Sequence, residues 1–199
     1  MSHLRVIAGE AKGRRLKLVP GDSTRPVTDR VKEALFNILG PMIQGTSFLD
    51  LFAGTGSVGI EALSRGAASA VLIDNQGGAI TTIQENLEIT GLKERATVIR
   101  ADVFQFLRHP SPSGFDFVYV APPQYKEIWH RVILQLDRDP ALLHPDAWII
   151  AQIDPVEYQD LALHNLVEFD RRQYGSTELL FFEYAALAAE PQSGSELTR

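Results

Sequence analysis

The sequence predicts an α/β fold built on a mostly parallel sheet. From residue 47 onward, short apolar runs of strand length alternate with segments whose apolar residues recur at helical spacing. A glycine-rich turn, Ala53-Gly-Thr-Gly-Ser-Val-Gly59, separates the first such run from the first helical segment. Strands that alternate with helices form parallel sheets with right-handed crossovers. Ligands of such sheets bind at the carboxyl ends of the strands, so functional residues are expected there.

The first 45 residues are expected to form an extension to this sheet. Residues 5–8 and 15–19 have the composition of short strands, and the glycines and Pro20-Gly21 around them indicate a small hairpin. Thr28 is placed to cap a helix over residues 29–39. Gly40-Pro41 should end that helix.

The remaining elements follow the alternation in order. Strands are expected at 47–52, 70–73, 96–100, 115–120, 148–153, 166–169 and 179–184, and helices at 57–65, 76–90, 103–107 and 126–136. We expect a single domain over residues 1–185, in which a basic extension (1–45) precedes a ligand-binding catalytic core (46–185). Residues 186–199 have the composition of a disordered tail.

Composition excludes several function classes. The chain has 199 residues and no cysteine, which excludes disulfides, cysteine-ligated zinc, iron–sulfur clusters and a thiol nucleophile. The five histidines lack metal-ligand spacing, so no metal is expected. No apolar run approaches the ~20 residues needed to cross a bilayer, and the N-terminus lacks the apolar run of a signal peptide. We therefore expect a cytoplasmic protein without membrane contact, and a monomer.

The charge is distributed unevenly along the chain. The net charge is −6, which argues against nucleic-acid binding. Residues 1–40, however, hold eight Lys and Arg against four Asp and Glu, whereas the other 159 residues hold 11 against 21. This asymmetry is compatible with one basic face on an acidic body.

The glycine-rich turn predicts a nucleotide-type ligand, and Asp50 indicates which one. Glycines at this spacing occur at sites for NAD, FAD or S-adenosylmethionine (SAM), and also in turns without a ligand. A dinucleotide would bring its pyrophosphate to the following helix N-terminus, where the carboxylate of Asp50 would repel it. SAM has no phosphate, and its ammonium and sulfonium groups favour a carboxylate. The absence of Gly-Lys-Ser/Thr excludes a P-loop.

Two further acids support a SAM site. Asp74 ends the second predicted strand, where an acid can bind both ribose hydroxyls, although it could also be a solvated turn residue. Asp102 ends the third strand and could accept a hydrogen bond from the adenine amino group, cap the next helix, or do both. Glu61 could face the cofactor or serve as a surface or capping residue. The predicted cofactor site comprises Asp50, Phe52, Ala53, Gly54, Thr55, Gly56, Asp74, Asn75, Asp102 and Val103.

These segments resemble the bacterial RsmD family over most of residues 4–184. The resemblance rests on Asp50–Gly59 with the following Ile60-Glu-Ala-Leu-Ser-Arg-Gly-Ala, on Arg5-Val-Ile-Ala-Gly-Glu-Ala-Lys-Gly-Arg-Arg-Leu, on Thr24-Arg-Pro-Val-Thr-Asp-Arg-Val-Lys-Glu-Ala-Leu-Phe-Asn-Ile-Leu, and on Tyr174-Gly-Ser-Thr-Glu. It implies a Rossmann-like, seven-stranded class I methyltransferase. The implied reaction is methylation of the N2 amino group of a guanine in 16S ribosomal RNA, as naked RNA or in the assembling small subunit. SAM is the implied donor and S-adenosylhomocysteine the product.

One departure concerns the end of the fourth strand. The family has Asp or Asn before Pro-Pro and an aromatic directly after, whereas this chain has Ala121-Pro122-Pro123-Gln124-Tyr125. An exocyclic amine is a poor nucleophile, and an acceptor at the first position would orient it. Alanine has none, so backbone carbonyls at Ala121 and Pro122, with Gln124, are expected to accept instead. Tyr125 would stack on the flipped-out base. The Pro-Pro pair could also merely shape a turn.

A basic arm is the expected RNA contact. Lys and Arg side chains can neutralise phosphates, although a run of charge can also be a solvated face. The candidates are Lys12, Arg14, Arg15, Lys17, Arg25 and Arg30, of which Arg25 and Arg30 could instead tie the arm to the catalytic body. Three rival functions stay open: methylation of another planar amine such as adenine N6 or a glutamine amide, weak or absent catalysis in an RNA-binding protein that has kept a SAM pocket, and an NAD-dependent enzyme.

Overall fold

The computed structural model describes residues 4–21, 27–108 and 114–184. Arg25 and the tail expected at 186–199 lie outside this part of the chain. Within the described ranges, no helix has the length and apolar character needed to cross a membrane.

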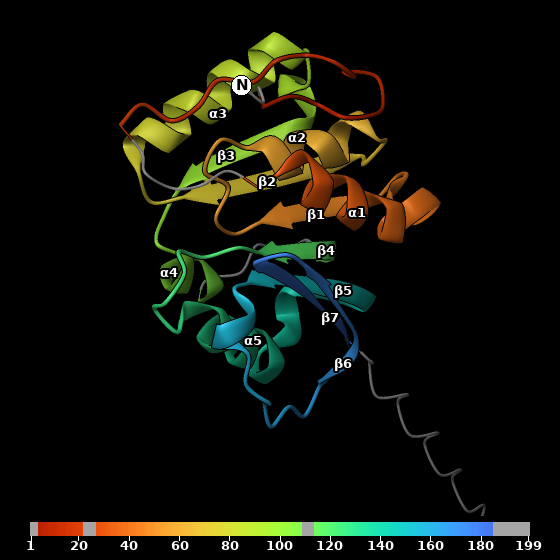
Figure 1. Ribbon diagram of the computed structural model, residues 1–199, viewed down its shortest axis with the longest axis vertical. Helices are drawn as coiled ribbons and strands as arrows, with labels where there is room; N and C mark the ends of the chain where they lie inside the picture. The colour runs from red at the N-terminus through yellow and green to blue at the C-terminus, as the bar shows by residue number, and fades with distance from the viewer. Residues whose placement is uncertain (1–3, 22–26, 109–113, 185–199) are drawn as a thin grey trace, which may run out of the picture.

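The fold is a seven-stranded, mostly parallel sheet, which confirms the predicted class (Figure 1). The strand order is β3-β2-β1-β4-β5-β7-β6; the first five strands in the chain run parallel, and β7 is antiparallel to both β5 and β6. The carboxyl ends of β1, β2, β3, β4 and β5 therefore meet at one edge. The strands are β1 (Ser47–Asp50), β2 (Ser69–Asp74), β3 (Ala96–Arg100), β4 (Phe115–Val120), β5 (Leu143–Ile153), β6 (Leu166–Tyr174) and β7 (Thr177–Tyr184).

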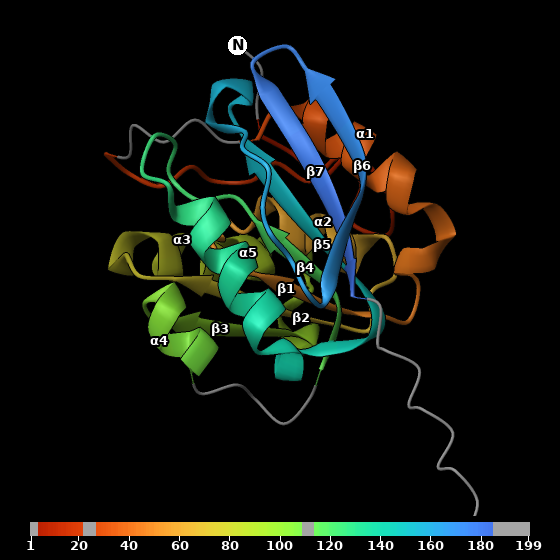
Figure 2. The ribbon, with the colours of Figure 1, turned by 90° about the horizontal axis from the view of Figure 1, so that it is seen from below.

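Helices cover both faces of the sheet, and the sheet separates the hydrophobic core into two clusters. On one face pack α1 (Asp29–Leu39), α2 (Ser57–Ser64) and α3 (Gly77–Thr90). On the other pack α4 (Val103–Arg108) and α5 (Ile128–Arg138), which lie side by side in Figure 2. Short 3-10 turns occur at Gly40–Ile43, Lys93–Arg95, Pro140–Leu142 and Pro155–Glu157.

Helix α1 begins and ends where its sequence predicts. The Thr28 hydroxyl oxygen accepts a hydrogen bond from the Val31 N–H at 3.3 Å, which satisfies one of the free amides of the first turn. Gly40, at φ 52°, follows the last helical residue and turns the chain away.

The predicted N-terminal hairpin is present, although it is shorter than the two strands expected at 5–8 and 15–19. Arg5 pairs with Arg15 in an antiparallel bridge, and the N–H groups of Val6 and Leu16 donate across the hairpin to the carbonyls of Arg14 and Leu4 at 3.0 and 2.8 Å. The amides of Ile7 and Ala8 donate to the Glu61 carboxylate, and the N–H of Lys17 donates to the Asn86 side chain. These bonds hold the hairpin against α2 and α3 (Figure 1).

Several other predicted boundaries shift by a few residues. β5 begins at Leu143 rather than 148, with an irregular register against β4. β6 continues to Tyr174, five residues past its apolar part, because a paired strand can be polar at the edge of a sheet. α5 begins at Ile128 because Glu127 has φ 51°, outside the helical region.

Candidate active site

The turn after β1 presents open backbone at the carboxyl edge of the sheet. Gly54 has φ 54°, and a Cβ placed on it would meet nothing within 4 Å. By contrast, a Cβ on Gly59 would lie 2.8 Å from Leu72, so this glycine is needed for the packing of α2 on the sheet. Gly56 precedes α2 at φ 77°, close to Leu72 and Ile83. The first glycine thus leaves room for a ligand, and the other two serve packing.

Asp50, the last residue of β1, is a buried carboxyl group. Its exposed fraction is 1%. Burial raises its pKa to about 7, the nearby carboxylate of Asp74 adds to the rise, and the amides of Phe52 and Gly59 oppose it. No salt bridge to Asp50 is found in the described part of the chain. Its ionised form is costly without a cation, so the position favours a positively charged ligand.

Asp74 and Asp102 stand at the ends of β2 and β3. The Asp74 carboxylate accepts from the Gly54 N–H and from the Gln76 N–H, each at 2.9 Å, which joins two neighbouring turns. Asp102 is exposed, and one oxygen accepts from the amides of Phe104 (3.0 Å) and Gln105 (3.1 Å). The capping role considered for Asp102 is therefore present.

The other predicted cofactor residues lie around the same edge. Ala53 and Val103 are buried, whereas Phe52, Thr55 and the exposed Asn75 border the turns between them. The Ala53 N–H donates to the Ile73 carbonyl at 2.8 Å, which continues the pairing of β1 and β2 into the turn.

The segment Ala121–Tyr125 follows β4, the neighbour of β1 on the other side. The Leu51 N–H donates to the Tyr119 carbonyl at 3.0 Å, so the ends of β1 and β4 are joined. Ala121 and Pro122 are half-buried, and Pro123 and Gln124 are exposed. The Pro-Pro segment therefore lies one strand away from Asp50.

Tyr125 is held by two acids that the sequence did not indicate. Its hydroxyl donates to Asp154 at 2.9 Å, and its N–H donates to Glu157 at 2.7 Å. The bond to Asp154 raises the pKa of the Tyr125 phenol. The backbone has φ 60°, and 68% of the residue is exposed. The ring is thus fixed at its hydroxyl and left open to solvent.

Tyr119, which is buried, and Gln152, which is half-buried, form a link between β4 and β5. The phenol of Tyr119 donates to the Gln152 side-chain oxygen. Burial raises the pKa of Tyr119 well above its usual value, and the nearby Asp50 adds to this. The phenol therefore stays protonated and acts as a permanent donor.

The N-terminal segment is clamped to α2 by Glu61. This side chain is fully buried, and it accepts from the N–H groups of Ile7 (2.8 Å) and Ala8 (3.0 Å). Lys32 and Arg65 lie 3.5 and 2.8 Å from the same carboxylate. Glu61 therefore neither faces the cofactor nor lies on the surface; it balances buried cations and holds backbone.

Asn86 joins the N-terminal segment to the glycine-rich turn. It is fully buried on α3. Its side chain accepts from the Lys17 N–H at 2.7 Å and donates to the carbonyls of Lys17 and Thr55 at 3.1 and 2.9 Å. The basic candidates Lys12, Arg14, Arg15, Lys17 and Arg30 are all exposed, and Lys17 pairs with Glu85 at 3.1 Å.

Comparison with known proteins places the chain in a family. Residues 4–183 match the family described as "Conserved hypothetical protein 95", and curated relatives of the chain are named ribosomal RNA small subunit methyltransferase D. The chain belongs to the RsmD family. Among its relatives, Bacillus subtilis "Putative rRNA methyltransferase YlbH" is 39% identical over 90% of this chain and 98% of its own length. Haemophilus influenzae "Ribosomal RNA small subunit methyltransferase D" is 32% identical over 74% and 86%.

Solved structures support the fold assignment of this RsmD-family chain. The "Putative methyltransferase yhhF" of Escherichia coli has a TM-score of 0.82 at 31% identity, over 94% of this chain and 100% of that one. An RNA methyltransferase of Salinibacter ruber, in complex with S-adenosyl-L-homocysteine, has a TM-score of 0.62 at 14% identity, over 85% and 100%, and shows the shared fold only. The class I methyltransferase fold predicted from the sequence is confirmed.

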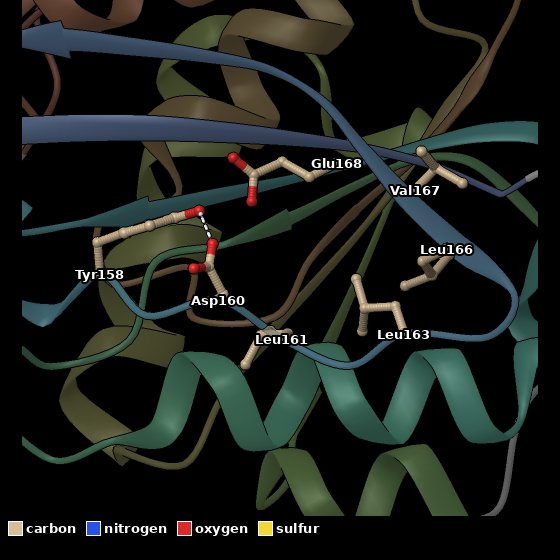
Figure 3. Close-up of a pocket in the computed structure, with 7 residues that line it drawn as sticks. All are labelled: Tyr158, Asp160, Leu161, Leu163, Leu166, Val167 and Glu168. Carbon is tan, nitrogen blue, oxygen red and sulfur yellow. Dashed lines mark hydrogen bonds between the residues drawn. The ribbon is translucent and has the colours of Figure 1, made fainter.

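A hollow in this RsmD-family chain lies beside the candidate site without belonging to it. It measures about 410 Å³ between the 158–163 segment and β6 (Figure 3). On the 158–163 side, the Tyr158 hydroxyl donates to the Asp160 carboxylate at 2.8 Å, which raises the pKa of Tyr158 to about 12. Its lining contains none of the residues predicted to bind cofactor or base.

Proposed function

We propose that this chain transfers a methyl group from SAM to the N2 amino group of a guanine in 16S ribosomal RNA. The observation that carries the proposal is one juxtaposition. A buried carboxyl group beside an open glycine turn ends β1, and an exposed aromatic on a Pro-Pro segment follows β4, the adjacent strand. Adjacent parallel strands bring cofactor and target to the same edge.

The cofactor side fits SAM in charge and space. Asp50 offers a buried negative charge to the ammonium group, and Gly54 leaves its backbone open. A carboxylate has about four acceptor positions, so Asp74 and Asp102 can receive ribose hydroxyls and the adenine amine beside their backbone bonds. Bound SAM supplies an electrophilic methyl group. Phe52, Ala53, Thr55, Gly56, Asn75 and Val103 would line the same pocket.

The target side fits a planar base. The Tyr125 ring is exposed and its hydroxyl is fixed by Asp154, so it offers a preset stacking face. The carbonyls at Ala121 and Pro122 lie at the end of β4, where they can accept hydrogen bonds from an amine. These groups orient the nucleophile, and the reaction needs no strongly shifted general base because the methylated amine loses its proton readily.

The RNA side rests on the basic arm and on the names of relatives. Lys12, Arg14 and Arg15 are exposed on a segment that Glu61 and Asn86 hold against the core. Relatives of this chain are named as rRNA and small-subunit methyltransferases. We take 16S ribosomal RNA, free or in the assembling subunit, as the partner, and a monomer as the working state.

The test is transfer of labelled methyl from SAM to unmodified small subunits and to naked 16S RNA, followed by nucleoside analysis. Label in N2-methylguanosine is expected. Label in another nucleoside, or in protein, would reject guanine N2 and support a different planar amine. Binding of RNA and S-adenosylhomocysteine without label, beside an active control enzyme, would reject catalysis.

A further inference from the structure

We propose that Gln152 supplies the side-chain acceptor for the target amine that Ala121 cannot supply. The proposal rests on the function proposed above and deepens it. Ala121 directly follows β4 and has only a methyl group at the point where the amine would be held. Gln152, on the neighbouring strand β5, carries a carboxamide at the same edge of the sheet.

The strand register places the two residues side by side. β4 and β5 are parallel, with Tyr119 opposite Ile150 and Val120 opposite Ala151. One step further along both strands come Ala121 and Gln152. Side chains alternate between the faces of a sheet, so the side chains of Ala121 and Gln152 lie on the same face as that of Tyr119. In agreement with this, Ala121 packs in the same core cluster as Tyr119.

Tyr119 fixes the orientation of the carboxamide. Its phenol stays protonated beside Asp50 and donates to the Gln152 oxygen. A carbonyl oxygen has two lone pairs, so one remains for a second donor such as an amine. The half-buried position of Gln152 also limits competition from water.

Other acceptors near the Pro-Pro segment are less suited to this task. Gln124 is exposed, so holding its side chain in one orientation would cost conformational entropy. Asp154 accepts from Tyr125 and Val156, and Glu157 accepts from Tyr125. Gln152 combines an anchored position with a free lone pair.

The proposed role is to orient the nitrogen and to favour its developing charge. N2 forms a bond to the methyl carbon while the bond from that carbon to sulfur breaks, and the electron pair of the broken bond stays on sulfur. N2 becomes positive and releases a proton to water. The Gln152 oxygen accepts a hydrogen bond from the N2–H that is not lost in the reaction. This bond turns the nitrogen lone pair toward the methyl group and stabilises the positive charge.

The experiment compares Gln152→Leu with the double variant Gln152→Leu/Ala121→Asn. Gln152→Leu is expected to lower kcat by about 100- to 1,000-fold, the range observed on losing one preorganised hydrogen bond. Ala121→Asn restores an acceptor on the neighbouring strand, so it should recover most of that loss in the double variant. A purely structural role for Gln152 would give no such rescue.

Controls separate the possible failures. Gln44→Leu is the matched control, since it makes the same change at an exposed residue before β1, at the opposite edge of the sheet. This variant should keep full activity. S-adenosylhomocysteine affinity and thermal unfolding report on folding. If Gln152→Leu does not fold, two other variants test the proposal. Gln152→Glu keeps an acceptor, whereas Tyr119→Phe leaves the carboxamide free to rotate. Gln152→Glu should therefore retain more activity than Tyr119→Phe.

Each outcome has one meaning. Full activity of folded Gln152→Leu, absent rescue by Ala121→Asn, or Tyr119→Phe as active as wild type would overturn the role of Gln152 while leaving the methyl transfer intact. A wild-type protein that labels no RNA would instead reject the proposed function, and this inference with it.

Discussion

At the scale of single residues, Asp50 opposes folding and favours ligand binding. A carboxyl group with 1% exposure and a second carboxylate nearby is costly to ionise. Its pKa of about 7 lies above that of an unfolded aspartate, so the folded chain binds more protons than the unfolded chain between pH ~4 and ~7. The free energy of unfolding therefore falls as pH rises through this window, and the loss persists above it. A cationic ligand would offset this cost.

Asp50→Asn separates the two effects. The neutral side chain keeps the shape and an acceptor for the Phe52 N–H, so at pH 8 the ligand-free variant should be more stable than wild type by about 1–3 kcal/mol, with the gap closing near pH 4. SAM affinity of the wild type should rise as pH increases through about 7, and the variant should bind at least tenfold more weakly at pH 8. Urea unfolding and calorimetry at both pH values measure this. Equal stability at pH 8 would contradict the account.

At the scale of elements, the sequence correctly predicted the structures that depend on interactions between residues close together in the chain. Helix α1 has its cap and its stop signal within its own sequence, and both were found where expected. The N-terminal hairpin forms, but its attachment to the core was not predicted, because Glu61 and Asn86 lie 53 and 69 residues away from amides that they bind. Glu61 stands in an otherwise apolar helix, which is a signal for a buried charge, but its partners cannot be identified without the fold.

Gly9 and Gly13 provide a matched pair within this segment. Both have φ near 84°, yet a Cβ on Gly9 would lie 1.8 Å from the Ser64 carbonyl oxygen, whereas one on Gly13 would meet nothing within 4 Å. Gly13→Ala should cost about 1–2 kcal/mol of unfolding free energy from backbone strain alone. Gly9→Ala should cost about 3 kcal/mol or more, because α2 must move as well.

Chemical unfolding of both variants measures the difference, and limited proteolysis of the N-terminal segment shows whether it detaches from α2. Equal costs would mean that the segment does not depend on close contact with Ser64.

At the scale of the whole molecule, strand order and strand register differ in how far they can be predicted. Alternating strands and helices predicted the parallel sheet, and the sequence pattern correctly placed Asp50, Asp74 and Asp102 at the ends of three strands that are neighbours in it. Register did not follow from the pattern. The link from Tyr119 to Gln152 and the hold of Asp154 and Glu157 on Tyr125 depend on how β4 and β5 pair and on the turn after β5, which no local signal encodes.

The basic segment makes a final prediction about the molecule as a whole. The chain carries −6 overall, so a polyanion would be repelled unless it met a local excess of positive charge. Replacing Lys12, Arg14 and Arg15 together with alanine should weaken RNA binding. The fall of log affinity with log salt should also become shallower by about 2–3, since each phosphate contact contributes about 0.7–0.9 to the steepness of that fall. Lys93→Ala/Arg138→Ala, which removes exposed charges outside the segment, should leave the slope unchanged. The test is RNA affinity measured at four salt concentrations, with S-adenosylhomocysteine binding as a folding check. Equal salt dependence of the triple variant and the wild type would show that RNA binds elsewhere.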